Sequence, residues 1–218
     1  MSMNQFRRFT YLISGKHNTV LELSVTIKSE DVQKQLKAAG ILSFEIYHKA
    51  PNHFVLIDAE QSMDSTDISR MLSNMSEDLE QASPLERIYK FEQKAVYSAK
   101  DGQLKMAIGA KKRFVWTLLL QEDEALIEEY KRVHSIGQAW PEITANMKTV
   151  GVKDMEIYLF GTQAILIMDT KPDFNLEDVG PKWQKLPREE EWQAYVAKFQ
   201  RIDPKSSIQE KWQDMIEL

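Results

Sequence analysis

The sequence predicts an α+β fold built from two ferredoxin-like domains in tandem, and three observations lead to this prediction. A segment recurs, since GILSFEIYHKAPNHFVLIDAE begins at Gly40, GVKDMEIYLFGTQAILIMDTK begins at Gly151, and Glu-Ile-Tyr starts five residues after each glycine. Arg-Phe opens an apolar segment ahead of each copy, at Arg8 and Arg113. The second half follows the order β-α-β-β-α-β. Because such sheets tend to bury their open face against a second sheet, we expect a pseudo-dimeric α+β barrel within one chain.

The two copies are expected to meet near Lys111, which gives a degenerate domain over residues 1–111 and a second domain over residues 112–218. Just before this boundary, an Asp-Gly pair between alternating apolar residues indicates a hairpin. In the first domain VLELSVTI, residues 20–27, alternates and is rich in β-branched residues, which favours a strand over a helix. Two unrelated α+β domains with similar strands are the alternative to a repeat.

The second domain begins with a strand and two helices. RFVWTLLLQ, from Arg113, is apolar and β-prone, which predicts a strand. DEALIEEYKRVH, residues 123–134, carries an apolar stripe at helical spacing and acidic residues at its start, where the helix dipole favours them. Pro141 suits the first position of a following helix, and Gly151 suits the residue after its end.

The remaining elements are a hairpin, two helical segments and a tail. DMEIYLF and AILIMDT flank a Gly-Thr turn and predict the hairpin, and DFNLEDVGPKWQKL reads as a broken helix. PREEEWQAYVAKFQ, from Pro187, predicts a helix in which the Arg-Glu-Glu-Glu run is a solvated charge cluster at the start. The C-terminal EKWQDMIEL is expected to form a last strand.

The composition excludes several classes of function. A net charge of -5 gives no basic surface for nucleic acid. No apolar run approaches the roughly 20 residues that span a bilayer, and the N-terminal segment lacks a signal-peptide pattern, so we expect a cytoplasmic protein without membrane attachment. The chain has no cysteine, and its four histidines lack zinc-site spacing. No Gly-rich phosphate loop of a common type occurs.

The segment EYKRVHSIGQAWPE, residues 129–142, holds the candidate chemistry. Tyr130 and His134 are four residues apart, so a helix presents both on one face. An imidazole titrates nearest to neutral pH and suits general acid–base catalysis. The structural alternatives are a helix-ending role for His134, a core role for Tyr130, and packing at the start of the next helix for Trp140.

The second half resembles the L-rhamnose mutarotase family. The matching pieces are Tyr130 and His134 in YKRVH, WPEI at Trp140, DMEIYLFGT, PREEEWQAYVAKFQ and EKWQDMIEL, and together they span residues 112–218. The resemblance implies a cytoplasmic enzyme that interconverts the α and β anomers of a 6-deoxy-hexose such as L-rhamnose or L-fucose, without metal or cofactor.

The resemblance also implies roles for single residues. His134 matches the family's proposed proton donor, and Tyr130 matches a residue that contacts the sugar. A Trp-Trp pair that lines the family's pocket aligns with Trp192 and Gln193, so Gln193 replaces one tryptophan. Met155 stands where the family often has a tyrosine. An aromatic ring such as Trp192 would cover the apolar face of a deoxy sugar, although its register with neighbouring apolar residues equally fits the core.

Two other functions stay open on the sequence. The replacements at Gln193 and Met155 favour a non-catalytic sugar-binding or sensor protein on the same fold. A monooxygenase or haem-handling protein rests on fold analogy alone. The first domain lacks the Tyr/His helix, so we expect it to supply a second sheet, and further oligomerisation is left open.

Overall fold

The computed structural model describes residues 5–13, 17–75, 82, 84–92, 94–201 and 212–218. The chain folds into two compact units. The first unit is built from residues 1–86, 97–107 and 215–218, and the second from residues 87–96 and 108–214. Relative to a single cut at Lys111, residues 87–96 therefore belong with the second half, and the last four residues belong with the first.

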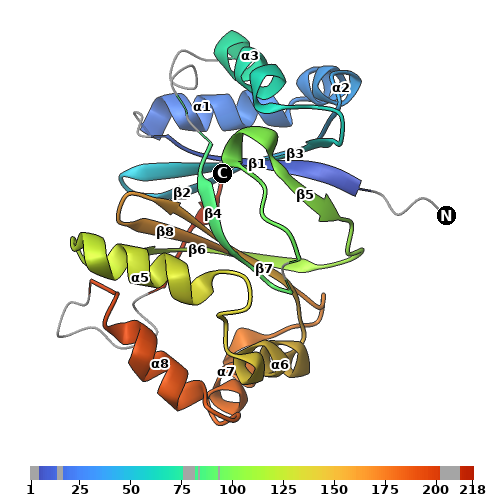
Figure 1. The fold of residues 1–218 in the computed structure, drawn as a ribbon. Coiled ribbons are helices and arrows are strands. Elements are labelled where there is room, and N and C mark those ends of the chain that lie inside the picture. Colours follow the sequence, from blue (N-terminus) through green and yellow to red (C-terminus); the bar gives the residue numbers. More distant parts are fainter. Residues whose placement is uncertain (1–4, 14–16, 76–81, 83, 93, 202–211) are drawn as a thin grey trace. The chain divides into compact units, whose positions relative to one another are not determined.

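The first unit has one five-stranded sheet with the strand order β10-β2-β3-β1-β5. Helices α1, α2 and α3 lie on one side of this sheet (Figure 1). The elements are β1 (Gln5–Ile13), α1 (His17–Lys28), α2 (Glu30–Ala38), β2 (Ile41–Lys49), β3 (Asn52–Glu60), α3 (Ser65–Met75), a 3-10 turn (Ala99–Asp101), β5 (Gln103–Met106) and β10 (Ile216–Glu217).

The second unit has a sheet with the order β4-β7-β8-β6-β9, and helices α5, α6, α7 and α8 cover one side of it (Figure 1). The elements are β4 (Glu86–Lys90), β6 (Lys112–Leu119), α5 (Glu124–His134), α6 (Pro141–Val150), β7 (Val152–Phe160), β8 (Gln163–Thr170), α7 (Leu176–Trp183), α8 (Glu189–Ala197) and β9 (Gln213–Asp214). In the first unit β1 and β2 both pair antiparallel with β3, and in the second unit β6 and β7 both pair antiparallel with β8, as in ferredoxin-like domains. The predicted α+β class with tandem ferredoxin-like units is confirmed.

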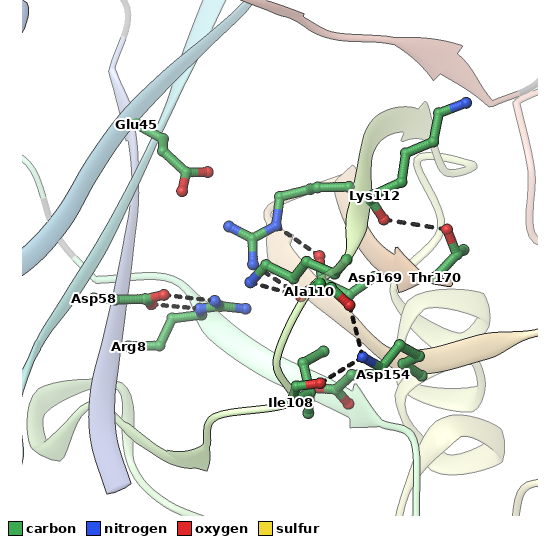
Figure 2. Close-up of polar contacts among 12 residues, drawn as sticks. Arg8, Glu45, Asp58, Ile108, Ala110, Lys112, Asp154, Asp169 and Thr170 are labelled. Atoms are coloured by element: carbon green, nitrogen blue, oxygen red, sulfur yellow. Dashed lines mark hydrogen bonds and ion pairs between the residues drawn. The ribbon is translucent and has the colours of Figure 1, made fainter. Parts of the chain in front are cut away.

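The same ion pair recurs in both sheets. Arg8 on β1 lies opposite Asp58 on β3, with Nε–Oδ1 and Nη2–Oδ2 distances of 2.7 and 2.8 Å, as Figure 2 shows. Arg113 on β6 lies opposite Asp169 on β8, and the two corresponding distances are again 2.7 and 2.8 Å. Two-pronged pairs of this kind fix the geometry of both partners. The Arg-Phe and Asp landmarks of the sequence therefore mark equivalent positions in the two units.

The backbone around the two glycines repeats as well. Gly40 and Gly151 both have a positive φ, 88° and 104°, a conformation that glycine adopts without strain. In each unit the glycine carbonyl accepts a bond from a backbone N–H at the end of the partner strand, Glu60 at the end of β3 or Lys171 just after β8, at 2.8 and 2.9 Å. The register of the following strand shifts at the same place in both units. These matches support the proposal that the halves are copies of one domain.

Three predictions for single segments are wrong. Residues 20–27 form part of helix α1, because Val20, Leu23 and Ile27 recur at helical spacing and are all buried. The expected hairpin before Lys111 is a short turn followed by β5 alone, which pairs with β1. The tail forms two short strands instead of one, β9 beside β6 and β10 beside β2.

Apart from the tail, the helices and strands expected in the second half are present. Pro141 is the first residue of α6, and Gly151 ends that helix in a left-handed conformation. Asp123 caps α5 by accepting a bond from the backbone of Leu126 at 3.0 Å. Within the described residues, no helix is both long and apolar enough to cross a membrane.

Candidate functional site

A cavity of about 190 Å³ lies within the second unit. This volume exceeds that of the roughly 150 Å³ cavity which admits a benzene-sized molecule, so a six-membered ring fits. The walls come from the inner face of the sheet and from helices α5, α6, α7 and α8. The chain has five tryptophans, and all five line this cavity: Trp116, Trp140, Trp183, Trp192 and Trp212.

The four residues singled out from the sequence all line this cavity. They are Tyr130 and His134 on α5, and Trp192 and Gln193 on α8. The rings of Tyr130 and His134 lie 4.3 Å apart between centroids, and the His134 and Trp192 rings lie 5.6 Å apart, edge to face. The helical spacing of four residues therefore brings the phenol and the imidazole together as expected. The chemical roles of all four residues stay predictions.

His134 is a neutral imidazole with a defined tautomer. Its Nδ1 lies 2.8 Å from the backbone carbonyl oxygen of Tyr130, and because a carbonyl only accepts, Nδ1 carries the hydrogen. Burial lowers the pKa of His134 to about 4, an effect that the bond to Tyr130 only partly offsets. At neutral pH the ring therefore has a lone pair on Nε2, which is able to accept a proton.

Tyr130 supplies a hydroxyl that stays protonated. The side chain is buried, and burial raises its pKa above the usual value. No hydrogen bond to this hydroxyl occurs within the described parts of the chain. A group that enters the cavity therefore meets a neutral phenol that both donates and accepts.

Sequence reasoning missed the most unusual acid of the site. Glu189 is the first glutamate of the Arg-Glu-Glu-Glu run that was expected to be solvated, yet it is 3% exposed and lines the cavity, whereas Glu190 and Glu191 are exposed. Asn146 Nδ2 and Trp183 Nε1 donate to its Oε1 at 3.0 and 2.9 Å. The spacing of Glu189, Trp192, Gln193 and Val196 along one helix face was the signal that could have identified it.

A second polar side chain at the cavity is that of Gln200. Gln200 lines the cavity and is buried, and its Oε1 has no hydrogen-bond partner among the described residues. A buried acceptor left unpaired costs about 1–3 kcal/mol, so a donor on a bound molecule would recover that energy. In the same described part of the chain, no group of three or more His, Asp or Glu side chains is arranged to hold a metal ion.

Trp140 and Met155 contribute to both packing and the cavity. Trp140 immediately precedes α6, stacks beneath the Arg188 guanidinium at 4.1 Å, and also lines the cavity. Met155, on β7, forms part of the cavity wall. Trp140 is therefore more than a helix-starting packing residue.

Comparisons with known proteins relate the second unit to sugar isomerases. Residues 113–218 match the family model described as L-rhamnose mutarotase. A curated protein of Xanthomonas campestris named L-fucose mutarotase is 30% identical over 102 residues, which are 47% of this chain and 82% of that protein. A Dictyostelium discoideum protein designated UPF0734 is 32% identical over 108 residues, which are 48% of this chain and 85% of that protein.

A likeness to a solved structure extends over both units. It is with a protein of Lactobacillus acidophilus described as a candidate monooxygenase, with a TM-score of 0.50 and 9% identity. The match covers 98% of this chain and 94% of the other. At this identity the likeness concerns the fold alone.

Proposed function

The chain belongs to the L-rhamnose mutarotase family through residues 113–218, and on this premise we propose that it interconverts the α and β anomers of a 6-deoxy-hexose such as L-rhamnose or L-fucose. The observation that carries the proposal is a neutral imidazole, His134, on the wall of an aromatic cavity that fits a six-membered ring. Mutarotation opens and recloses a hemiacetal ring, and this chemistry needs one proton accepted and one donated.

His134 acts on the hydroxyl of the anomeric carbon. With Nδ1 held by the Tyr130 carbonyl, Nε2 is the ring nitrogen that accepts the hydroxyl proton as the ring opens. The acceptor returns this proton when the ring closes on the other face. This assignment reverses the direction of the first proton transfer expected from the family resemblance, because a ring with a pKa of about 4 holds no second proton at neutral pH.

The remaining predicted residues position the sugar. Trp192 covers the apolar C–H face of the ring, and the neutral Tyr130 hydroxyl bonds to a sugar oxygen. Gln193 and Gln200 provide amide groups for further hydroxyls, and the unpartnered Oε1 of Gln200 accepts from one of them. The apolar wall, which includes Met147, Met155 and Ile157, accommodates the methyl group of a deoxy sugar.

The test is exchange between anomers, measured by two-dimensional exchange NMR on L-fucose and L-rhamnose with and without the protein. We expect faster exchange for at least one of them. L-galactose, which adds a hydroxyl to L-fucose at the methyl position, is the matched control and should be a poorer substrate by up to about 10²-fold. If the protein neither binds any of these sugars nor accelerates their exchange, the proposal is contradicted.

A non-catalytic sugar-binding protein is the second candidate. Gln193 and Met155, which stand where the family carries aromatic residues, favour it. The same experiment separates the two candidates. Saturation transfer from protein to sugar without faster exchange would support binding alone.

A further inference from the structure

Glu189 is built into the second unit as a buried acid. It is the first residue of α8, and its carboxyl lies against α6 through Asn146 and against α7 through Trp183. Asn146 is itself held in place by a bond of 2.9 Å to the carbonyl oxygen of Pro187. Three elements therefore fix one carboxyl group at the wall of the cavity.

The two oxygens of this carboxyl differ. Both hydrogen bonds, from Asn146 and Trp183, end on Oε1. No donor reaches Oε2 from the described residues, so Oε2 is the oxygen open to a bound molecule. When the group is protonated, the proton belongs on Oε2, because Oε1 already accepts two hydrogens.

The surroundings favour the protonated form. Burial raises the pKa of Glu189, and the bonds from Asn146 and Trp183 offset this effect only in part. The other titratable groups that line the cavity are Tyr89 on β4 and Tyr130 and His134 on α5. The guanidinium of Arg188 is engaged by Glu142 and Glu191 at 3.3 and 3.1 Å, and it is not bonded to Glu189.

We propose that Glu189 is the second catalytic residue of the cavity, the group that gives a proton to the ring oxygen of the bound sugar and takes it back on closure. This inference rests on the proposed mutarotase function. It completes the pair that the reaction requires, since His134 accepts one proton and a different group must donate the other.

Ring opening involves both side chains. Nε2 of His134 takes the proton of the anomeric hydroxyl, and the electrons of that O–H bond form the carbonyl. The bond between the anomeric carbon and the ring oxygen breaks, and its electron pair goes to the ring oxygen, which takes the proton from Oε2 of Glu189. After rotation about the bond next to the carbonyl, every transfer reverses on the other face, and both groups return to their starting states.

The experiment compares Glu189→Gln with Glu190→Gln. The amide at position 189 keeps an acceptor for Asn146 and Trp183 but has no acidic proton, and Glu190 is an exposed glutamate one residue further on. Exchange of L-fucose and L-rhamnose anomers is measured by NMR between pH 4 and pH 9, and thermal unfolding checks the fold. For the wild type we expect kcat to fall as pH rises through the pKa of Glu189.

For Glu189→Gln we expect kcat to drop by about 10²–10⁴-fold, with the alkaline fall of the pH profile lost and KM little changed. Glu190→Gln should match the wild type. A Glu189→Gln enzyme with wild-type kcat and an intact alkaline fall overturns the inference and leaves the proposed function standing. A wild type that exchanges neither sugar overturns both.

A second variant decides the matter where Glu189→Gln does not fold. Glu189→Asp keeps an acid but shortens its side chain, so it should retain an alkaline fall at a reduced kcat. Wild-type kcat in Glu189→Asp would overturn the inference, because a withdrawn carboxyl cannot serve the ring oxygen equally well.

Discussion

The two units share a framework but fill it differently. Tyr11 and Trp116 both stand three residues after the paired arginine, and Phe44 and Met155 both stand four residues after the glycine with positive φ. In the first unit the helices pack through aliphatic side chains, and Val20, Leu23, Ile27, Ile68 and Leu72 are all buried. In the second unit the helices present Tyr130, His134, Glu189 and Trp192 to a cavity.

This difference separates folding from chemistry. The arginine–aspartate pair, the glycine turn and the strand register occur in both units, so they serve the framework. A buried histidine and a buried glutamate are expensive to place in an apolar interior, and the first unit forms the same framework without the Tyr/His helix. The cost of these groups in the second unit is therefore better explained by a reaction than by stability.

The largest expected effect is a loss of kcat on substitution of His134, the residue on which the proposed difference between the two units depends most. His134→Gln removes the proton acceptor while keeping a side chain of similar length, so kcat for anomer exchange should fall by about 10²–10⁴-fold. NMR exchange rates measure this directly. Ser24→Ala, at a buried polar residue of α1 in the first unit, is the control and should leave kcat unchanged. Equal losses in both variants would contradict the division of labour between the units.

Much of the fold could be predicted from sequence because its signals are local. The helix with Tyr130 and His134, the Pro141 start and the Gly151 end follow from spacing and capping within a few residues. Helix α1 was missed because β-branched residues outweighed the burial spacing of Val20, Leu23 and Ile27. The pairing of β10 with β2 was missed because strand partners are chosen by contacts far apart in the chain.

In the candidate site, too, local signals could be predicted from the sequence, whereas contacts between distant segments could not. Tyr130 and His134 could be predicted because they share one helix face, and Trp192 and Gln193 because they align with a Trp-Trp pair of the family, in which Gln193 replaces one tryptophan. Burial of Glu189 depends on Asn146 and Trp183, which arrive from other helices. Within the run of three glutamates, the local sign is only that Glu189 shares a helix face with Trp192 and Val196.

The next largest effect is expected from the pair that both units share. Arg8→Met leaves Asp58 without its buried partner and should lower the free energy of unfolding by about 3–5 kcal/mol. Arg113→Met should cost less, because Lys111 Nζ still lies 3.3 Å from Asp169 Oδ2. Urea unfolding measures both changes. A larger loss of stability for Arg113→Met than for Arg8→Met would contradict this prediction.

A smaller effect on the free energy of unfolding is expected when the pH is lowered. The pKa of His134 is about 4 in the folded protein against an ordinary value near 6.5, so the unfolded chain binds the extra proton between these pH values. Stability due to this group is complete above pH 6.5 and is lost as pH falls toward 4, by about 3 kcal/mol. Urea unfolding followed by tryptophan emission reports the second unit alone, since all five tryptophans line its cavity. His134→Gln should lack this part of the acid sensitivity, and identical pH dependence in both proteins would contradict it.

The smallest effect is expected when the side chains at two equivalent positions of the units, Phe44 and Met155, are exchanged. Met155→Phe places at the cavity wall the residue type that the first unit has at Phe44. The larger ring should raise the free energy of unfolding by about 1 kcal/mol, because cavity filling commonly stabilises by this amount, and it should raise KM about tenfold by occupying space that the sugar needs. The reverse change, Phe44→Met, is the matched control. It should cost less than about 1.5 kcal/mol of stability and leave KM unchanged. Because only the second unit is argued to hold a ligand, a rise in KM for Phe44→Met would show that the first unit does more than supply the repeated framework.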